Sequence, residues 1–217
     1  MIFIRLFFFF FLILGCGSQK ETPSKIATEN SPKETYPVFL FVGDSLTAGL
    51  GVDIKNCFVS QLQKEFEKSK ISLETRNAGI SGETSSGTLE RIDWLIASKP
   101  KIIFLCIGSN DGLRGISADL YRKNMEQIIS KIQKAEIKLI LAGIKLPINF
   151  GAEYTQTMEA IPTELAKKYS IIYYPFLLEG VAADPKLNQP DFIHPNEKGH
   201  QVIFEHLHQF FKENQIY

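Results

Sequence analysis

The sequence predicts an α/β protein, a three-layer α/β/α sandwich in which helices cover both sides of a mostly parallel five-stranded sheet. Two continuous apolar runs, Val38–Val42 and Ile102–Ile107, are typical of strands buried on both faces. Segments with apolar residues at helical spacing alternate with the predicted strands along the chain, as in proteins with a parallel sheet. Residues 38–217, about 180 in number, suit one domain with a sizeable core.

The first half of the domain supplies three predicted strands and two predicted helices. Gly43 closes the first strand, and the second strand, Ile71–Thr75, is predicted from alternating apolar residues. The helix between them, Asn56–Lys68, carries apolar residues at helical spacing. A second helix, Thr84–Ser98, ends before Pro100, and the run Ile102–Ile107 is the third strand.

The second half continues the alternation. A helix is predicted from apolar residues at positions i, i+4, i+7, i+8 and i+11, namely Tyr121, Met125, Ile128, Ile129 and Ile132. Ile137–Ile144 and Ile171–Tyr174 are the fourth and fifth strands, with the helix Met158–Tyr169 between them. The last helix turns four residues inward, which are Ile203, Leu207, Phe210 and Phe211. We expect its three histidines, His200, His206 and His208, on the surface.

The N-terminus has the pattern of a secretory signal, assigned to residues 1–15. Arg5 precedes an unbroken apolar run, Leu6–Leu14, which is too short to cross a bilayer because a spanning helix needs about 20 apolar residues. A buried strand or a helical anchor is the alternative. Leu12–Cys16 resembles the lipobox of bacterial lipoproteins, which implies lipidation of Cys16. The sequence therefore predicts an exported lipoprotein, anchored to a membrane and facing the periplasm or the cell exterior.

Residues 16–37 are predicted to be a tether between this anchor and the domain at residues 38–217. The segment is rich in Ser, Thr, Lys, Glu and Pro, and it nearly lacks large apolar residues. Lys and Arg number 24 and Asp and Glu also 24, without a basic stripe, which argues against a nucleic-acid partner. No Cys/His pattern resembles a metal site, and the spacing of Cys57 and Cys106 leaves open whether they pair.

Polar loops follow the predicted strands, at the edge where ligands bind in such sheets. Ser45 follows the first strand, where a helix start supplies N–H groups for a developing oxyanion; taken alone, this segment is also the pattern of a helix-capping serine. Gly82 lies in a small-residue loop after the second strand, and Asn110 follows the third strand. A tight turn and a polar turn are the alternatives there. Asp191 and His194 are spaced to meet through the imidazole ring, just before the last helix.

These four loops together resemble the four sequence blocks of the SGNH, or GDSL, hydrolase family, whose fold is flavodoxin-like. The similarity runs from about Val38 to Phe211. Three further segments are similar to the family's bacterial thioesterase, lysophospholipase and arylesterase branch, namely Ser81–Thr84, Asn110–Gly115 and Leu146–Gly151.

The resemblance implies a role for each residue. Ser45 is the nucleophile, His194 the base and Asp191 the carboxylate that orients it. The Ser45 N–H, the Gly82 N–H and the Asn110 amide form the oxyanion hole. Ser109 departs from the family pattern, in which glycine often precedes the Asn-Asp pair.

The activity that follows is hydrolysis of lysophospholipid, fatty acyl or aryl esters, or of thioesters, by a monomer without cofactor or metal. Apolar residues in the loops near the site could line a groove for an acyl chain, or they could cover the core: Leu113, Leu146, Ile148, Phe150 and Tyr154. An O-deacetylase of carbohydrate or cell-wall esters is the alternative within the family. A non-catalytic, membrane-tethered binding protein is the alternative from another class.

Overall fold

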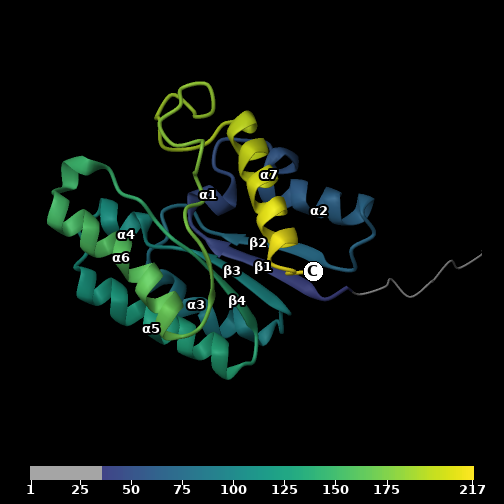
Figure 1. Cartoon of the computed structure of the whole chain (residues 1–217), viewed down its shortest axis with the longest axis horizontal. Helices are drawn as coiled ribbons and strands as arrows, with labels where there is room; N and C mark the ends of the chain where they lie inside the picture. The colour runs from purple at the N-terminus through teal and green to yellow at the C-terminus, as the bar shows by residue number, and fades with distance from the viewer. Residues whose placement is uncertain (1–35) are drawn as a thin grey trace, which may run out of the picture. The chain divides into compact units, whose positions relative to one another are not determined.

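Five parallel strands form the sheet of this protein in a computed structural model that describes residues 36–217 (Figure 1). The order across the sheet is β2-β1-β3-β4-β5. The strands are β1 (Val38–Gly43), β2 (Glu74–Gly79), β3 (Ile102–Cys106), β4 (Lys138–Ala142) and β5 (Ile172–Tyr174). The predicted fold class is therefore confirmed. The predictions for the signal and for nearly all of the tether fall on residues 1–35, outside the described residues.

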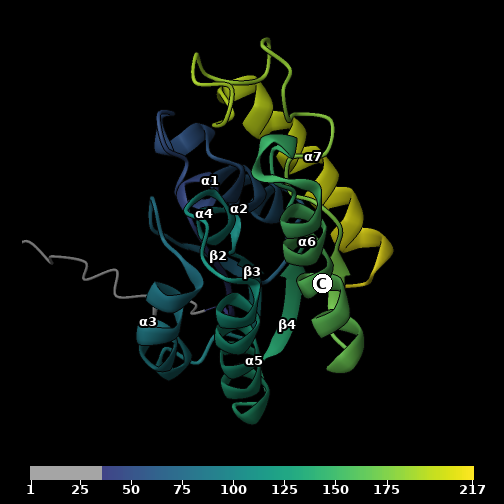
Figure 2. The same cartoon turned by 90° about the vertical axis from the view of Figure 1, so that its left-hand side faces the viewer.

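Helices cover both faces of the sheet. Those that precede or follow the strands are α1 (Ser45–Ala48), α2 (Phe58–Lys68), α3 (Ser85–Ala97), α4 (Ser109–Leu113), α5 (Ala118–Lys134), α6 (Ala152–Lys168) and α7 (Glu197–Glu213), with short 3₁₀ turns η1 (Ile54–Asn56) and η2 (Ile148–Phe150). Figures 1 and 2 show α3, α5 and α6 on one face, and α2 and α7 on the other. Connections between parallel strands place helices in this way.

Successive residues of β1 face opposite layers, which is why its sequence is apolar throughout. Leu40 and Val42 pack in the cluster with α3, α5 and α6, whereas Phe39 and Phe41 pack in the cluster with α2 and α7. All six residues of β1 are buried. A central strand of this kind fixes the position of whatever follows its carboxyl end, and that residue pair is Asp44 and Ser45.

Most predicted boundaries agree with the structure within two residues, but two elements differ from it by more. The second strand begins at Glu74, not Ile71, and it runs to Gly79. Its residues Arg76 and Asn77 are exposed at the sheet edge and so carry no apolar pattern. Helix α6 begins at Ala152 rather than Met158. The apolar pattern missed its first turns, because the side chains there are mostly exposed and polar.

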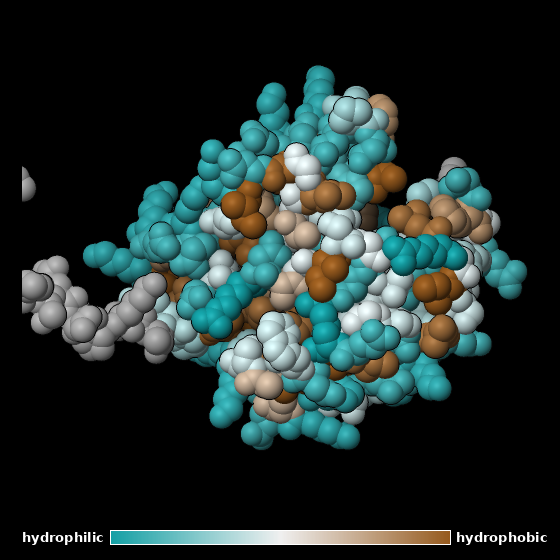
Figure 3. All heavy atoms as spheres, turned by 180° about the vertical axis from the view of Figure 1, so that it is seen from behind, coloured by the Kyte–Doolittle hydropathy of each residue, from teal (hydrophilic) through white to brown (hydrophobic). Residues whose placement is uncertain are grey.

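Hydrophobic side chains on the face shown in Figure 3 form small groups separated by hydrophilic ones, as is usual for a folded protein surface. Among the described residues, no helix combines the length and apolar character needed to span a membrane. In the same part of the chain, no group of three or more His, Cys, Asp or Glu side chains is placed to hold a metal ion.

Candidate active site

Ser45 is the first residue of α1, directly beyond the carboxyl end of β1. The residue that caps this helix is Asp44, whose carboxylate Oδ1 accepts the Leu46 N–H at 3.0 Å. The alternative that Ser45 is the helix cap is therefore wrong. Because Asp44 satisfies the backbone donor, the Ser45 hydroxyl is available to a partner from another segment.

That partner is His194, in the segment between β5 and α7. The Ser45 Oγ lies 2.8 Å from His194 Nε2, and His194 Nδ1 lies 2.7 Å from Asp191 Oδ2. A carboxylate at Nδ1 favours the tautomer with the proton on Nδ1, which leaves Nε2 to accept the serine hydroxyl. The structure thus brings together three predicted residues from the two ends of the domain.

Asp191 is held in its ionised form. Its Oδ1 accepts the backbone N–H groups of His194 at 3.0 Å and of Ile193 at 2.9 Å. Hydrogen bonds from the His194 backbone and ring, and then from Ile193, lower the pKa of Asp191 from 3.8 to about 2. Because the folded pKa lies below the unfolded value, these bonds stabilise the fold above about pH 4. Their contribution is lost as the pH falls towards 2.

Gln189 fastens the histidine loop to the segment after Ser45. Its side-chain Nε2 donates to the carbonyl oxygens of Leu50 at 2.6 Å and Pro195 at 3.0 Å. Its backbone N–H donates to the His194 carbonyl at 2.8 Å. Asp191 and His194 follow Gln189 by two and five residues, so this cross-link helps to fix their position relative to Ser45. Sequence reasoning missed Gln189, because a glutamine in a polar loop carries no distinguishing pattern.

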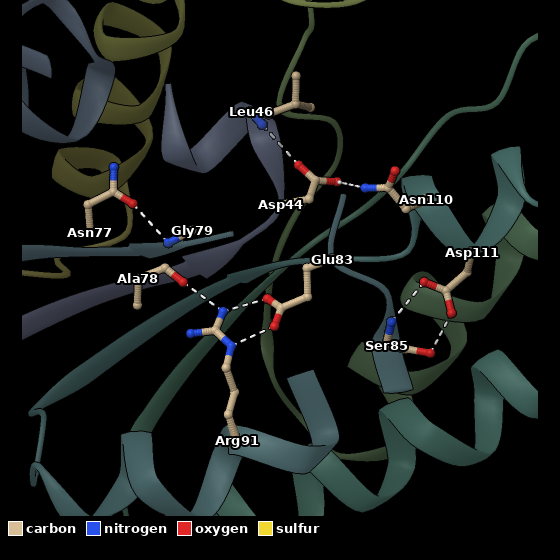
Figure 4. A network of polar contacts seen from close by, with 10 residues as sticks. All are labelled: Asp44, Leu46, Asn77, Ala78, Gly79, Glu83, Ser85, Arg91, Asn110 and Asp111. Carbon is tan, nitrogen blue, oxygen red and sulfur yellow. Dashed lines mark hydrogen bonds and ion pairs between the residues drawn. The ribbon is translucent and has the colours of Figure 1, made fainter. Parts of the chain in front are cut away.

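The two other predicted residues lie in neighbouring segments, which follow β2 and β3 at the same edge of the sheet. Gly82 has a φ of +79°, a conformation that L side chains rarely adopt, and its carbonyl accepts Arg114 Nη2 at 2.7 Å. Asn110 lies in α4, and its Nδ2 is 3.4 Å from Asp44 Oδ2. The Asn110 amide therefore reaches the residue before Ser45 (Figure 4).

A buried ion pair supports the Gly82 loop from below (Figure 4). Arg91 of α3 pairs with Glu83, with Nε 2.6 Å from Oε1, and it also donates to the Ala78 carbonyl at 2.6 Å. The Glu83 side chain is 5% exposed and the Arg91 side chain 18%, so solvent screens the pair little. The pair ties α3 to the residues on both sides of Gly82.

Replacing Arg91 with methionine is expected to lower the free energy of unfolding by about 3–5 kcal/mol, because it leaves the Glu83 carboxylate buried without a partner. Urea unfolding measures the change. The double variant Glu83→Gln, Arg91→Met is the control, and it should regain part of the loss since the buried charge is gone. A loss below about 1 kcal/mol in the single variant would show that the pair does not hold this loop.

Asp111 joins the Gly82 and Asn110 loops. Its buried carboxylate accepts the Ser85 N–H at 2.8 Å and the Ser85 hydroxyl, so it caps α3 from another segment. Asn124 of α5 donates to the same Ser85 hydroxyl at 3.0 Å. Burial raises the pKa of Asp111. The family resemblance includes Asp111 within a motif, but sequence reasoning assigned it no role.

Asp44 is a buried carboxyl group beneath the Ser45 turn. It is 2% exposed, and burial raises its pKa from 3.8 to about 6, with the Leu46 N–H lowering it in part. Among charged neighbours, Glu83 raises this pKa and His194 lowers it. An ionised Asp44 accepts hydrogen bonds from Leu46 and Asn110, and so holds the Asn110 amide near Ser45.

Replacing Asp44 with asparagine is expected to stabilise the fold at pH 8 and to slow ester hydrolysis. Folded Asp44 binds a proton between pH 6 and 4, where the unfolded chain does not, so wild-type stability falls as the pH rises through this range. Asparagine does not titrate, so the variant lacks this loss of stability, which is at most about 3 kcal/mol when the pKa is raised from 3.8 to about 6. Urea unfolding of wild type and variant at pH 4 and pH 8 measures their free energies of unfolding. A difference between the two proteins that is the same at both pH values would contradict the raised pKa of Asp44.

The histidines of α7 and the two cysteines of the domain have no predicted catalytic role. His200 is buried rather than on the surface: it is 1% exposed, and its Nδ1 accepts the Phe58 N–H at 3.4 Å between α2 and α7. Burial lowers its pKa to about 4. Its place in the first turn of α7, where that helix meets α2, explains the error, whereas His206 is exposed as expected. Cys57 and Cys106 are both buried free thiols.

The apolar residues for which the sequence leaves open a groove or a core position differ in burial. Leu146 is 7% exposed and packs against Gly112, and the Tyr154 hydroxyl donates to the Ile116 carbonyl at 2.7 Å. Both cover the core, which is the second of the two alternatives. Leu113 and Phe150 are half-buried, and the side chain of Ile148 lies outside the described residues.

A serine hydroxyl on an imidazole that is oriented by a carboxylate, at the carboxyl edge of a parallel sheet, is the arrangement of a serine hydrolase. The comparison with known proteins narrows the class. The GDSL-like Lipase/Acylhydrolase family model matches residues 41–202, so the chain belongs to this family of ester-bond hydrolases.

Relatives and solved structures agree with this assignment. The chain is 36% identical to the esterase TesA of Pseudomonas aeruginosa over 157 residues, covering 72% of this chain and 78% of that protein. It is 34% identical over 165 residues to "Thioesterase 1/protease 1/lysophospholipase L1" of Escherichia coli, covering 76% and 78%. Its fold matches that of the psychrotrophic esterase EstA from Pseudoalteromonas with a TM-score of 0.80 and 29% identity, covering 83% and 99%. That esterase was crystallised inhibited by monoethylphosphonate.

Proposed function

We propose that this protein hydrolyses fatty acyl, lysophospholipid or aryl esters, or thioesters, through an acyl-enzyme on Ser45. The observation that carries the proposal is the unbroken chain of contacts from Ser45 Oγ through His194 to Asp191, at 2.8 Å and 2.7 Å. The substrate class is supported by the names of the relatives, an esterase, a thioesterase and lysophospholipase, and an arylesterase.

The first half of the reaction forms the acyl-enzyme. His194 Nε2 takes the hydroxyl proton as Ser45 Oγ attacks the substrate carbonyl, and Asp191 stabilises the imidazolium. The negative charge that develops on the carbonyl oxygen is held by the Ser45 N–H, the Gly82 N–H and the Asn110 amide. The tetrahedral adduct then releases the alcohol or thiol, which takes its proton from His194.

The second half returns the enzyme to its starting state. His194 takes a proton from a water molecule, whose oxygen attacks the acyl carbon of the Ser45 ester. The adduct collapses to a carboxylic acid, and the Ser45 oxygen regains its proton from His194. The same oxyanion donors serve both halves, so one set of loops supports the whole cycle.

A chain-length series of nitrophenyl esters tests the substrate class. We expect turnover of butyryl and octanoyl esters at rates at least comparable with the acetyl ester, and release of fatty acid from a lysophospholipid. Hydrolysis confined to the acetyl ester would instead identify an O-deacetylase. The rates should be measured with the Ser45→Ala variant in parallel, so that non-enzymatic hydrolysis is subtracted.

We further propose that the protein is an exported lipoprotein, anchored to a membrane through Cys16 and acting as a monomer. Export and anchoring are supported by the apolar run Leu6–Leu14 and by the Leu12–Cys16 pattern. Metabolic labelling with a palmitate analogue, compared between wild type and Cys16→Ser, tests the anchor. Labelling of both chains, or of neither, would refute it.

A further inference from the structure

Four large apolar side chains are exposed around Ser45 and His194. Leu50, Ile80, Phe192 and Ile193 have exposed fractions of 45%, 48%, 59% and 51%. We call these four residues the apolar rim. They come from three loops that are far apart in the sequence, yet all three loops lie at the carboxyl edge of the sheet.

Backbone hydrogen bonds fasten the apolar rim to the nucleophile turn. The Leu50 N–H donates to the Ser45 carbonyl at 3.1 Å, and the Ile80 N–H donates to the Gly43 carbonyl at 2.9 Å. Ile193 directly precedes His194, whose Nε2 lies 2.8 Å from the Ser45 Oγ. Backbone contacts and chain neighbours therefore fix three of the four rim residues relative to the turn that carries the reacting hydroxyl.

Phe192, the most exposed residue of the rim, has a strained backbone conformation. Its φ of +58° lies in the left-handed region, where an aromatic residue is an outlier. Its N–H donates to the Gln189 carbonyl at 3.0 Å, and Gln189 in turn holds the Leu50 carbonyl. Binding surfaces often combine a strained backbone with apolar side chains that stay exposed and so do not stabilise the fold by burial.

We propose that the apolar rim docks the protein on a lipid layer, so that Ser45 meets ester substrates that remain in that layer. The inference rests on the proposed function, and it adds the surface from which substrate is taken. Separate side chains on three loops suit shallow insertion among lipid chains better than they suit a helix or strand of a protein partner. Arg114, exposed beside Gly82, adds a positive charge that suits phosphate headgroups.

The length of chain before the domain is compatible with this orientation. Twenty-two residue steps separate Cys16 from Val38, which span at most about 75 Å when fully extended. The six residues of β1 cover about 20 Å from the amino edge to the carboxyl edge of the sheet. A chain held at Cys16 is thus long enough for the carboxyl edge to face the membrane that holds it.

Co-sedimentation with vesicles of phosphatidylcholine and phosphatidylglycerol tests the proposal, using the full chain with Cys16→Ser to remove the predicted acylation site. Leu50→Ser with Ile80→Ser is expected to weaken vesicle binding about tenfold or more, because two apolar side chains no longer insert. Trp94→Ser is the matched control. Trp94 is 74% exposed in the last turn of α3, at the amino edge of the sheet, and its loss should change binding less than about twofold.

Two results would overturn the proposal. One is a parent chain that does not bind the vesicles. The other is vesicle binding by the double variant equal to that of the parent chain; if its KM for a monomeric long-chain ester is then raised, the rim is an acyl-chain subsite instead. Phe192→Asn, which the left-handed backbone accommodates, repeats the test if the double variant does not fold. Absence of fluorophosphonate labelling on Ser45 would refute the hydrolase mechanism separately, whatever the vesicles show.

Discussion

Replacing Asp191 with asparagine is expected to lower kcat by up to about 10⁴-fold while the protein stays folded. Asp191 accepts the Nδ1 proton of His194 at 2.7 Å, which leaves Nε2 free to accept the Ser45 hydroxyl. An asparagine amide can donate to Nδ1 instead, and the ring then carries its proton on Nε2, where it cannot act as a base. The imidazolium of the transition state also loses its counter-charge.

Steady-state hydrolysis of a nitrophenyl ester measures this loss. Asp93→Asn is the control, because Asp93 forms a surface ion pair with Lys131 on α5, away from the site, and its rate should remain within about twofold of wild type. The orientation account would fail if Asp191→Asn kept more than about a tenth of wild-type kcat. Circular dichroism establishes that the variant is folded.

Replacing Asn110 with alanine is expected to lower kcat by about 10²–10³, which corresponds to about 2.7–4 kcal/mol in the barrier. In the proposed mechanism the side-chain amide donates to the developing oxyanion, so its loss affects the transition state more than bound substrate. KM should therefore change little. The Asn110 amide lies 3.4 Å from Asp44, a long contact whose loss alone costs little stability.

Asn214→Ala is the matched control for this variant, since Asn214 lies at the end of α7 and its side-chain amide donates to the Phe210 carbonyl. Its kcat should equal that of wild type. An Asn110→Ala enzyme with an unchanged esterase rate would remove Asn110 from the oxyanion hole. A lower rate with a proportionately higher KM would instead point to substrate binding.

The central strands and the polar loops that follow them could be predicted from the sequence, because burial on both faces leaves an unmistakable apolar run. Val38–Val42 and Ile102–Ile107 are examples, and β1 and β3 lie there. The loop residues Ser45, Gly82, Asn110, Asp191 and His194 were found because four separate loops match one family together. The structure then brings Ser45, His194 and Asp191 within hydrogen-bonding distance.

The supporting residues could not be predicted, because their roles depend on contacts between segments far apart in the chain. The capping of Ser85 by Asp111 crosses 26 residues, and the link from Gln189 to Leu50 crosses 139. The pKa of Asp44 is raised because the carboxyl group is buried, and the sequence of a polar loop does not show which of its side chains are buried. The edge strand β2 was misplaced for a related reason, since exposed residues leave no periodicity in the sequence.

Labelling of the intact protein with a fluorophosphonate probe tests the central claim most directly, since such probes react with a serine oxygen that an adjacent base activates. The account predicts one adduct per chain, found on the peptide that contains Ser45, absent in Ser45→Ala and strongly slowed in His194→Ala. A folded protein that is not labelled, or labelling that persists in Ser45→Ala, would contradict the assignment of Ser45 as the nucleophile.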